Sequence, residues 1–179
     1  MRIISGKYRG LNLAEFKGQD IRPTSDRVKE SLFNILSFKI AGARVLDLFC
    51  GSGNLGIESL SRGATFVHFN DISRDSIAVL NKNLSRLKGD NYSVTALDFS
   101  LCLSRVKGFD IIFLDPPYAK DFGVEALKII GAGNLLNADG IVIFERDRSF
   151  SQELEGLEKY DERKYGKTFL TFFKKKELK

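Results

Sequence analysis

Strand-like and helix-like segments alternate from residue 44 to residue 145, and this alternation constrains the fold more than any other feature of the sequence. Short apolar runs with strand character each precede a stretch whose apolar residues fall at helical spacing. Such an order predicts an α/β fold, a doubly wound sheet with mostly parallel strands. The expected strands cover 44–48, 66–70, 92–96, 110–114 and 140–145, and the expected helices cover 54–62, 73–87, 99–106 and 122–131.

The two ends of the chain extend this core. Two more strands, 159–165 and 168–175, lie close enough in sequence to pair as an antiparallel hairpin, which brings the expected sheet to seven strands. Residues 2–13 predict a small hairpin, and residues 26–38 predict a helix capped by Ser25 or Thr24. We expect one domain over 1–179, with 1–40 as an N-terminal extension and 41–179 as the core. The helix is expected to bury Val28, Leu32, Ile35 and Leu36.

A glycine turn follows the first expected core strand, which ends in Asp47. Gly51 and Gly53 allow a ligand to approach the backbone closely. With Gly56 they also satisfy the GxGxxG spacing of dinucleotide-binding proteins, which is a weak signal alone, and no Lys follows to make a phosphate-binding P-loop. Asp47 separates the two interpretations, because a carboxylate there repels a pyrophosphate but attracts the amino group and sulfonium of S-adenosylmethionine.

Acidic residues also end the next two expected strands. Asp71 stands twenty residues after Gly51, the spacing at which a carboxylate binds ribose hydroxyls, although its neighbour Asn70 is an alternative. Asp98 follows the third strand, where it can accept a hydrogen bond from an adenine amino group. Each acid alone is more often a helix cap. Together with the glycine turn, they favour a single adenosyl ligand.

The fourth core strand ends in Asp115-Pro116-Pro117-Tyr118. Two prolines fix the backbone and remove two donors, so the turn can accept hydrogen bonds but offers few. An exocyclic NH2 could donate to the Asp115 carboxylate and the Pro116 carbonyl while Tyr118 stacks on the base. Taken alone, the four residues are equally well explained as a rigid turn with a solvated Asp. With the cofactor motif they predict a base-modifying site.

Several segments together resemble the RsmD family, which methylates guanine N2 in 16S ribosomal RNA. The resemblance implies a Rossmann-like methyltransferase sheet, with Asp115, Pro116, Pro117 and Tyr118 at the target base. It implies cofactor contacts at Asp47, Phe49, Gly51, Gly53, Asp71 and Asp98. The segments that carry it are the two motifs above, Met1-Arg2-Ile3-Ile4-Ser5-Gly6-Lys7-Tyr8-Arg9-Gly10, Arg22-Pro23-Thr24-Ser25-Asp26-Arg27-Val28-Lys29-Glu30 and Tyr165-Gly166-Lys167-Thr168.

Charge is distributed in a way that suits a nucleic-acid partner. The chain has a net charge of +5, with basic ends and an acidic middle. A cationic cofactor and an anionic polymer require such an arrangement. The resemblance to the RsmD family implies that this polymer is 16S ribosomal RNA, free or in a partly assembled small subunit. The sequence shows no export segment and no apolar run of membrane-spanning length, so we expect a cytoplasmic protein without membrane contact, and a monomer. The expected phosphate contacts are Arg2, Lys7, Arg9, Arg22 and Arg27, and the Lys174-Lys175-Lys176 run is interpreted as a solvated strand end.

Other functions remain open or lack the residues they need. Two separated cysteines and one histidine are too few for a zinc site or a Ser-His nucleophile, so no metal is expected and His68 is interpreted as a core residue. A DNA adenine-N6 methyltransferase would use the same turn, and a non-catalytic RNA-binding assembly factor could retain the fold. A glutamine methyltransferase more usually presents Asn at position 115. The sequence leaves the methylated nucleotide undetermined.

Overall fold

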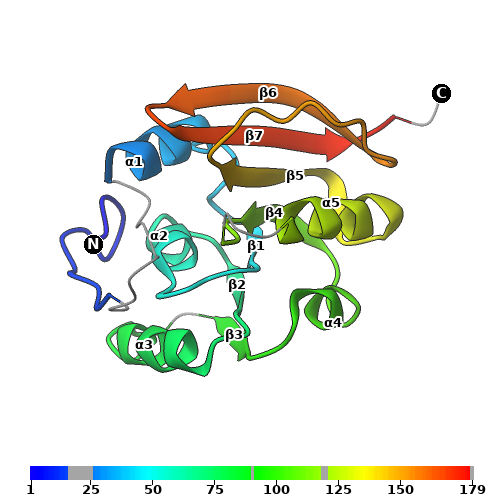
Figure 1. Cartoon of the computed structure of the whole chain (residues 1–179). Coiled ribbons are helices and arrows are strands. Elements are labelled where there is room, and N and C mark those ends of the chain that lie inside the picture. The colour runs from blue at the N-terminus through cyan, green and yellow to red at the C-terminus, as the bar shows by residue number, and fades with distance from the viewer. Residues whose placement is uncertain (16–25, 90, 118–120, 178–179) are drawn as a thin grey trace.

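The computed structural model describes residues 1–15, 26–89, 91–117 and 121–177. Within these ranges the chain forms a seven-stranded sheet in the order β3-β2-β1-β4-β5-β7-β6 (Figure 1). The strands are β1 (Arg44–Asp47), β2 (Phe66–Asn70), β3 (Tyr92–Thr95), β4 (Phe109–Leu114), β5 (Leu136–Arg146), β6 (Leu157–Tyr165) and β7 (Thr168–Lys175). The helices are α1 (Asp26–Ile35), α2 (Asn54–Ser61), α3 (Arg74–Leu84), α4 (Phe99–Leu103) and α5 (Phe122–Ala132).

Strand directions confirm the predicted doubly wound sheet. β1 pairs in parallel with β2 and β4, and the outer pairs β2 with β3 and β4 with β5 are parallel as well. β7 pairs antiparallel with both β5 and β6, as the expected closing hairpin requires. The prediction for β5 was too short. This strand starts at Leu136, which pairs with Phe109 before a shift in register.

The helices pack on both faces of the sheet, with one hydrophobic layer on each face. α1, α2 and α3 cover one face of the sheet, and α4 and α5 cover the other (Figure 1). Phe33 and Phe113 are buried in the first layer and Phe109 in the second, with at most 1% of each side chain exposed. Burying a side chain of this size contributes about 1.5–3 kcal/mol. The sheet is thus held as a rigid platform whose strand ends are fixed relative to one another.

Helix α1 differs from the prediction in its length and in its buried face. It ends at Ile35 rather than at residue 38, and Ile35 is 41% exposed although it was expected in the core. Phe33 and Lys29 take part in the buried face instead, beside the correctly predicted Val28, Leu32 and Leu36. The expected cap, Ser25 or Thr24, lies outside the described residues.

The first fifteen residues fold back on themselves but form less of a hairpin than predicted. A single antiparallel bridge joins Arg2 and Asn12 in this part of the described chain. The segment is fixed to α2 by Glu58, whose carboxylate accepts hydrogen bonds from the backbone amides of Ile4 at 2.9 Å and Ser5 at 3.1 Å. The N-terminal segment is therefore bound to the core through backbone groups.

None of the helices in the described ranges is long and apolar enough to cross a membrane. Cys50 and Cys102 are both buried and free, as expected for a chain without a disulfide framework.

Candidate active site

The carboxyl ends of five parallel strands meet along one edge of the sheet, where open α/β sheets bind ligands. Asp47 ends β1, Asp71 follows β2, Asp98 follows β3 and Asp115 follows β4. Backbone hydrogen bonds join these ends, such as the one from the Cys50 amide to the Asn70 carbonyl at 2.9 Å. The structure thus brings the four predicted acids to a common edge.

The glycine turn between β1 and α2 takes a backbone conformation that favours glycine. Gly51 and Gly53 have φ angles of +52° and +86°. A methyl group at Gly53 would lie 2.4 Å from Leu80, whereas one at Gly51 would meet no atom within 4 Å. The Gly51 amide donates to the Asp71 carboxylate at 2.9 Å. Gly53 is therefore required for packing, and Gly51 leaves an open face beside Asp71 for a ligand.

The two polar residues at the end of β2 have different surroundings. Asn70 is 1% exposed, and its amide group is fully used. It donates to the carbonyls of Leu48 at 3.3 Å and Leu97 at 3.0 Å, and it accepts from Thr95 and from the Leu97 amide. Asn70 therefore connects the loops after β1 and β3 through hydrogen bonds, and its amide has no donor or acceptor left for a ligand.

Asp71 is less buried than Asn70 and faces the glycine turn. One carboxylate oxygen accepts from Gly51, and the other accepts from the Ser73 amide at 2.8 Å. An ionised carboxylate has about four acceptor positions, so these two bonds leave capacity for hydroxyl donors. This arrangement supports the choice of Asp71 over Asn70 for ribose.

Asp47 is 2% exposed and lies beneath the glycine turn. Its carboxylate accepts a hydrogen bond from the Gly56 amide in the first turn of α2, at 2.9 Å. The pKa of Asp47 is raised to about 7, mainly by burial and also by the nearby Asp71 charge, while the hydrogen bond from the Gly56 amide lowers it. A positively charged ligand at this edge would favour the ionised form.

Protonation of Asp47 predicts a pH dependence of stability. Its pKa is raised from 3.8 to about 7 on folding, so the folded chain binds the extra proton between these values and becomes less stable as pH rises. One such group contributes at most about 1.4 kcal/mol per pH unit. Asp47→Asn should lack this decline. Urea unfolding of both proteins from pH 5 to 8 measures the difference, and parallel profiles would contradict the assignment.

Aromatic side chains and Asp98 form the β3 side of the edge. Phe49 contacts Phe99 with ring centroids 5.6 Å apart, and Phe99 contacts Phe122 at 5.4 Å. Asp98 is exposed and caps α4, since it accepts from the amide and hydroxyl of Ser100, which lowers its pKa. Asp98 has a helix-cap role in addition to its predicted role at adenine. The half-buried Phe49 supplies an apolar wall beside it.

The turn after β4 is supported by close packing of α5. Asp115 is half-buried, Pro116 is buried and Pro117 is exposed, while Tyr118 lies outside the described residues. A Cβ atom at Gly123 would lie 3.0 Å from the Pro116 ring and 2.3 Å from Phe144, so only glycine lets α5 approach so closely. The sequence analysis did not identify Gly123. Its position within the predicted helix 122–131 was the available signal.

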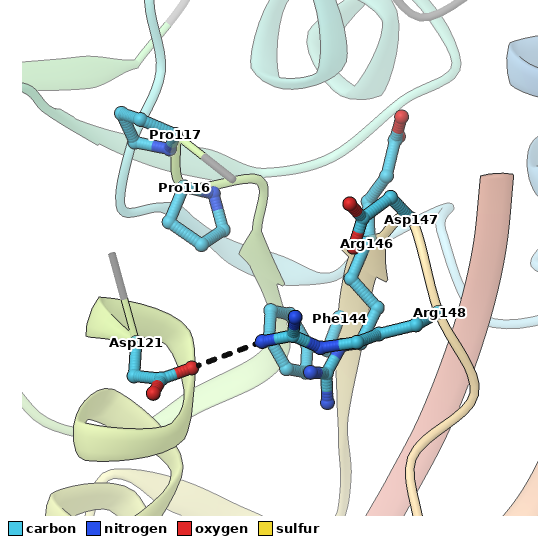
Figure 2. A pocket seen from close by; sticks show the side chains of 8 residues that line it. Pro116, Pro117, Asp121, Phe144, Arg146, Asp147 and Arg148 are labelled. Carbon is cyan, nitrogen blue, oxygen red and sulfur yellow. Dashed lines mark hydrogen bonds and ion pairs between the residues drawn. The ribbon is translucent and has the colours of Figure 1, made fainter. Parts of the chain in front are cut away.

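A pocket opens beside this turn. Figure 2 shows Pro116 and Pro117 on one side and Phe144, Arg146 and Arg148 on the other. The pocket joins the predicted catalytic turn to the end of β5, which the sequence analysis had not connected with a function. Among the described residues, no group of three or more His, Cys, Asp or Glu side chains is placed to bind a metal ion.

Comparison with known proteins agrees with this geometry. The model of the family described as "Conserved hypothetical protein 95" matches residues 1–174. "Ribosomal RNA small subunit methyltransferase D" of Haemophilus influenzae is 36% identical over 153 residues, which are 83% of this chain and 79% of that protein. The Escherichia coli protein of the same name is 34% identical over 148 residues, 82% and 75% of the two chains. This chain belongs to the RsmD family.

A solved structure supports the membership. The Escherichia coli protein yhhF is 30% identical with a TM-score of 0.87, and the match covers 98% of this chain and 97% of that one. The predicted RsmD-family fold is therefore confirmed over nearly the whole chain, and methyltransferase activity follows from the membership.

In this member of the RsmD family, a buried amide links the N-terminal segment to the glycine turn. Asn83 of α3 is 0% exposed. It accepts from the Ala14 amide at 2.8 Å and donates to the Ala14 carbonyl at 3.0 Å and the Ser52 carbonyl at 2.9 Å. The sequence analysis missed Asn83. Its position next to Leu84 on the buried stripe of the predicted helix 73–87 was the only signal.

Three of the predicted RNA contacts, Arg2, Lys7 and Arg9, are exposed on the same segment, and Arg27 is exposed on α1. Arg22 lies outside the described residues. Arg2 forms an ion pair with Asp26 at 3.3 Å.

His68 lies in the interior of β2, as expected of a core residue. Its ring nitrogens hydrogen-bond to the hydroxyls of Ser93 at 2.6 Å and Thr95 at 3.0 Å, and burial lowers its pKa.

Proposed function

We propose that this protein transfers a methyl group from S-adenosylmethionine to the exocyclic N2 amine of a guanine in 16S ribosomal RNA. One observation carries the proposal. The Asp115-Pro116 turn and the Asp47 glycine turn end neighbouring parallel strands, paired through Asp47 and Phe113, so a base and an adenosyl cofactor can meet there. Membership of the RsmD family, whose Haemophilus influenzae and Escherichia coli relatives are named small-subunit ribosomal RNA methyltransferases, supports the substrate.

The residues at this edge fit the cofactor. Asp71 would accept the ribose hydroxyls, and the open face at Gly51 admits the ligand against the backbone. Asp47 would favour the positively charged amino acid end of the cofactor, and Asp98 would accept from the adenine amino group. Phe49 adds an apolar wall for the adenine ring. Gly53 keeps the turn in the conformation that these contacts need.

The chain's own groups would orient the target amine and accept its proton. When bound, the cofactor would supply a methyl carbon attached to a positively charged sulfur. The amine nitrogen would bond to this carbon as the carbon–sulfur bond breaks, and the sulfur would leave as a neutral thioether. The Asp115 carboxylate and the Pro116 carbonyl would accept hydrogen bonds from the NH2 group and turn its lone pair towards that carbon. Asp115 would then accept the proton lost by the nitrogen and pass it to water. Orientation would supply most of the acceleration.

Methyl transfer from labelled S-adenosylmethionine tests this function. Small-subunit ribosomal RNA, DNA and protein are offered in parallel, and the labelled nucleotide in the RNA is mapped. We expect N2-methylguanosine in RNA alone. Label on DNA adenine would instead identify an adenine-N6 enzyme, and RNA binding without any transfer would identify an assembly factor. Comparing free RNA with partly assembled subunits would show which of them is the substrate.

RNA binding and methyl transfer are assigned to different parts of the chain. Residues 1–40 would contact RNA through the predicted basic side chains, and residues 41–179 would form the catalytic core of a monomer that acts in the cytoplasm. Three of these basic side chains, Arg2, Lys7 and Arg9, lie exposed on the segment that Glu58 and Asn83 fix to the core. RNA bound there would be held in a defined position relative to the cofactor edge.

Arg9→Gln is expected to weaken RNA binding without changing cofactor affinity. Loss of one phosphate contact should reduce the slope of log affinity against log salt by about 0.7–0.9. RNA affinity at several salt concentrations measures the effect, and Lys176→Gln, on the exposed C-terminal run, is the matched comparison. If only Lys176→Gln changes the slope, the RNA is bound by the C-terminal strands instead.

A further inference from the structure

The pocket beside the Pro116-Pro117 turn has a mixed lining. Arg146 and Arg148 contribute positive charge, and three carboxylates, Asp121, Glu145 and Asp147, contribute negative charge. A phosphate would meet more negative than positive groups here, which disfavours binding of a bare anion. A neutral ligand with both donor and acceptor edges suits such a lining better. The target base would meet Pro116 on one side of this lining and Phe144 and Arg146 on the other.

Arg146 is the unusual member of this lining. Its side chain is only 8% exposed, and its guanidinium lies over the rings of Phe144 at 5.1 Å and Phe150 at 5.5 Å. The guanidinium makes no hydrogen bond or ion pair with the residues that the structure describes. Burial, followed by the Arg148 charge, lowers its pKa. The ring faces fix the guanidinium plane, but its five N–H donors lack a hydrogen-bond acceptor among these residues.

We propose that Arg146 is a specificity-determining residue that donates paired hydrogen bonds to the O6 and N7 acceptors of the target guanine. The inference rests on the proposed function, since it assigns the rest of the base whose N2 amine meets Asp115. Arg146 lines the same pocket as Pro116, whose carbonyl is assigned to that amine. Paired donation from Arg to O6 and N7 is the commonest specific contact to guanine.

The same residues would discriminate against adenine. Adenine has an amino donor where guanine has O6, and its N1 is an acceptor where guanine has an N–H donor. An adenine would therefore turn a donor towards Arg146 and a lone pair towards the carboxylates of the lining. The exposed ion pair of Arg148 and Asp121, 3.3 Å apart at the edge of the pocket, contributes little and can open to admit the base (Figure 2).

A substrate analogue separates this role from general packing. The probe is an RNA oligonucleotide carrying the guanosine mapped in the methyl-transfer assay, compared with the same RNA carrying 7-deazaguanosine there. The analogue keeps the N2 amine and O6 but lacks the N7 acceptor. We expect wild-type kcat/KM to fall at least about fivefold on the analogue. Arg146→Met should be slower on guanosine RNA but equally fast on both RNAs, because the bond to N7 is already lost.

Controls keep each outcome interpretable. Unchanged cofactor affinity shows that Arg146→Met is folded. If Arg146→Met does not fold, Arg146→Lys is used instead, because lysine keeps an aliphatic chain between the two aromatic rings. Arg105 is an exposed arginine outside the pocket lining, so Arg105→Gln should prefer the guanosine RNA over the 7-deazaguanosine RNA as strongly as wild type does. If both Arg146 variants still methylate the guanosine RNA faster than the 7-deazaguanosine RNA, the inference is overturned. In that case, a smaller slope of log RNA affinity against log salt in the variants would identify Arg146 as a phosphate contact. A wild-type protein that methylates no guanosine would overturn the proposed function itself, and this inference with it.

Discussion

Replacing Asp115 with Ala is expected to reduce methyl transfer by about 100-fold or more while the affinity for S-adenosylmethionine stays within about twofold. Positioned proton transfer and orientation of the reacting amine account for effects of this size. Asp115 lies at the end of β4, which is paired on both sides with β1 and β5, and the turn after it is supported by α5. Loss of one half-buried carboxylate there should leave the fold intact.

Two further variants define what the carboxylate contributes. Asp115→Asn keeps the shape of the side chain and one acceptor, so it should still orient the target amine better than Asp115→Ala does. Because an amide cannot take up the proton, its turnover should nevertheless be slow. Asp139→Ala, an exposed aspartate at the other end of the sheet, should behave as wild type. Single-turnover transfer to RNA and calorimetric cofactor binding are the measurements. A folded Asp115→Ala protein with wild-type turnover would exclude the assigned role.

Local sequence patterns were sufficient to predict the strands and the acids that follow them. Each apolar run ends where a polar residue begins, and parallel strands place these ends on one edge, so Asp47, Asp71, Asp98 and Asp115 could be assigned to a common site. The strand β5 was the exception. Its first residues, around Leu136, alternate less clearly and are recruited to the sheet by pairing with Phe109, which is a contact between distant segments.

Partners that are distant in sequence explain what the patterns missed. Asn83 has no distinguishing pattern in the sequence, and the sequence suggests Asn70 only as an alternative ribose ligand. Both are buried, and distant loops satisfy all the hydrogen bonds of their amide groups. Arg146 directly follows the expected strand 140–145, and no local pattern indicates its burial. Its burial between Phe144 and Phe150 depends on the loop after β5 folding back. Tertiary contacts of this kind leave no local periodicity.

Lys29 shows how periodicity can mislead. It lies four residues before Phe33 on the buried face of α1, where a lysine is seldom found. Its ammonium donates to the Arg2 carbonyl at 2.6 Å and to Asn54 at 2.7 Å, and it lies 3.3 Å from the Glu58 carboxylate. Burial lowers the pKa of Lys29 despite the nearby Glu58 charge. The charge is tolerated because Glu58 is buried beside it.

Glu58→Ala is therefore expected to destabilise the protein by about 3–5 kcal/mol, the usual cost of removing one partner of a buried ion pair. The substitution leaves the Lys29 ammonium buried without its counter-charge and removes the acceptor for the Ile4 and Ser5 amides. Urea unfolding measures the free energy. Hydrogen exchange should show faster exchange at these two amides than in the strands of the sheet, because the N-terminal segment loses its anchor to α2.

Two comparison proteins separate the ion pair from the loss of packing. The double variant Lys29→Met with Glu58→Leu removes both charges and should cost less than Glu58→Ala alone, because the fully buried Lys29 charge is gone. Both variants lose the Glu58 partner of Arg62, whose side chain is 14% exposed, so that loss cancels in the comparison. Glu155→Ala, at an exposed glutamate, should change stability by no more than about 0.5 kcal/mol. If the double variant is as unstable as Glu58→Ala, the bonds that Glu58 accepts from Ile4, Ser5 and Arg62, and not the buried charge of Lys29, determine its contribution.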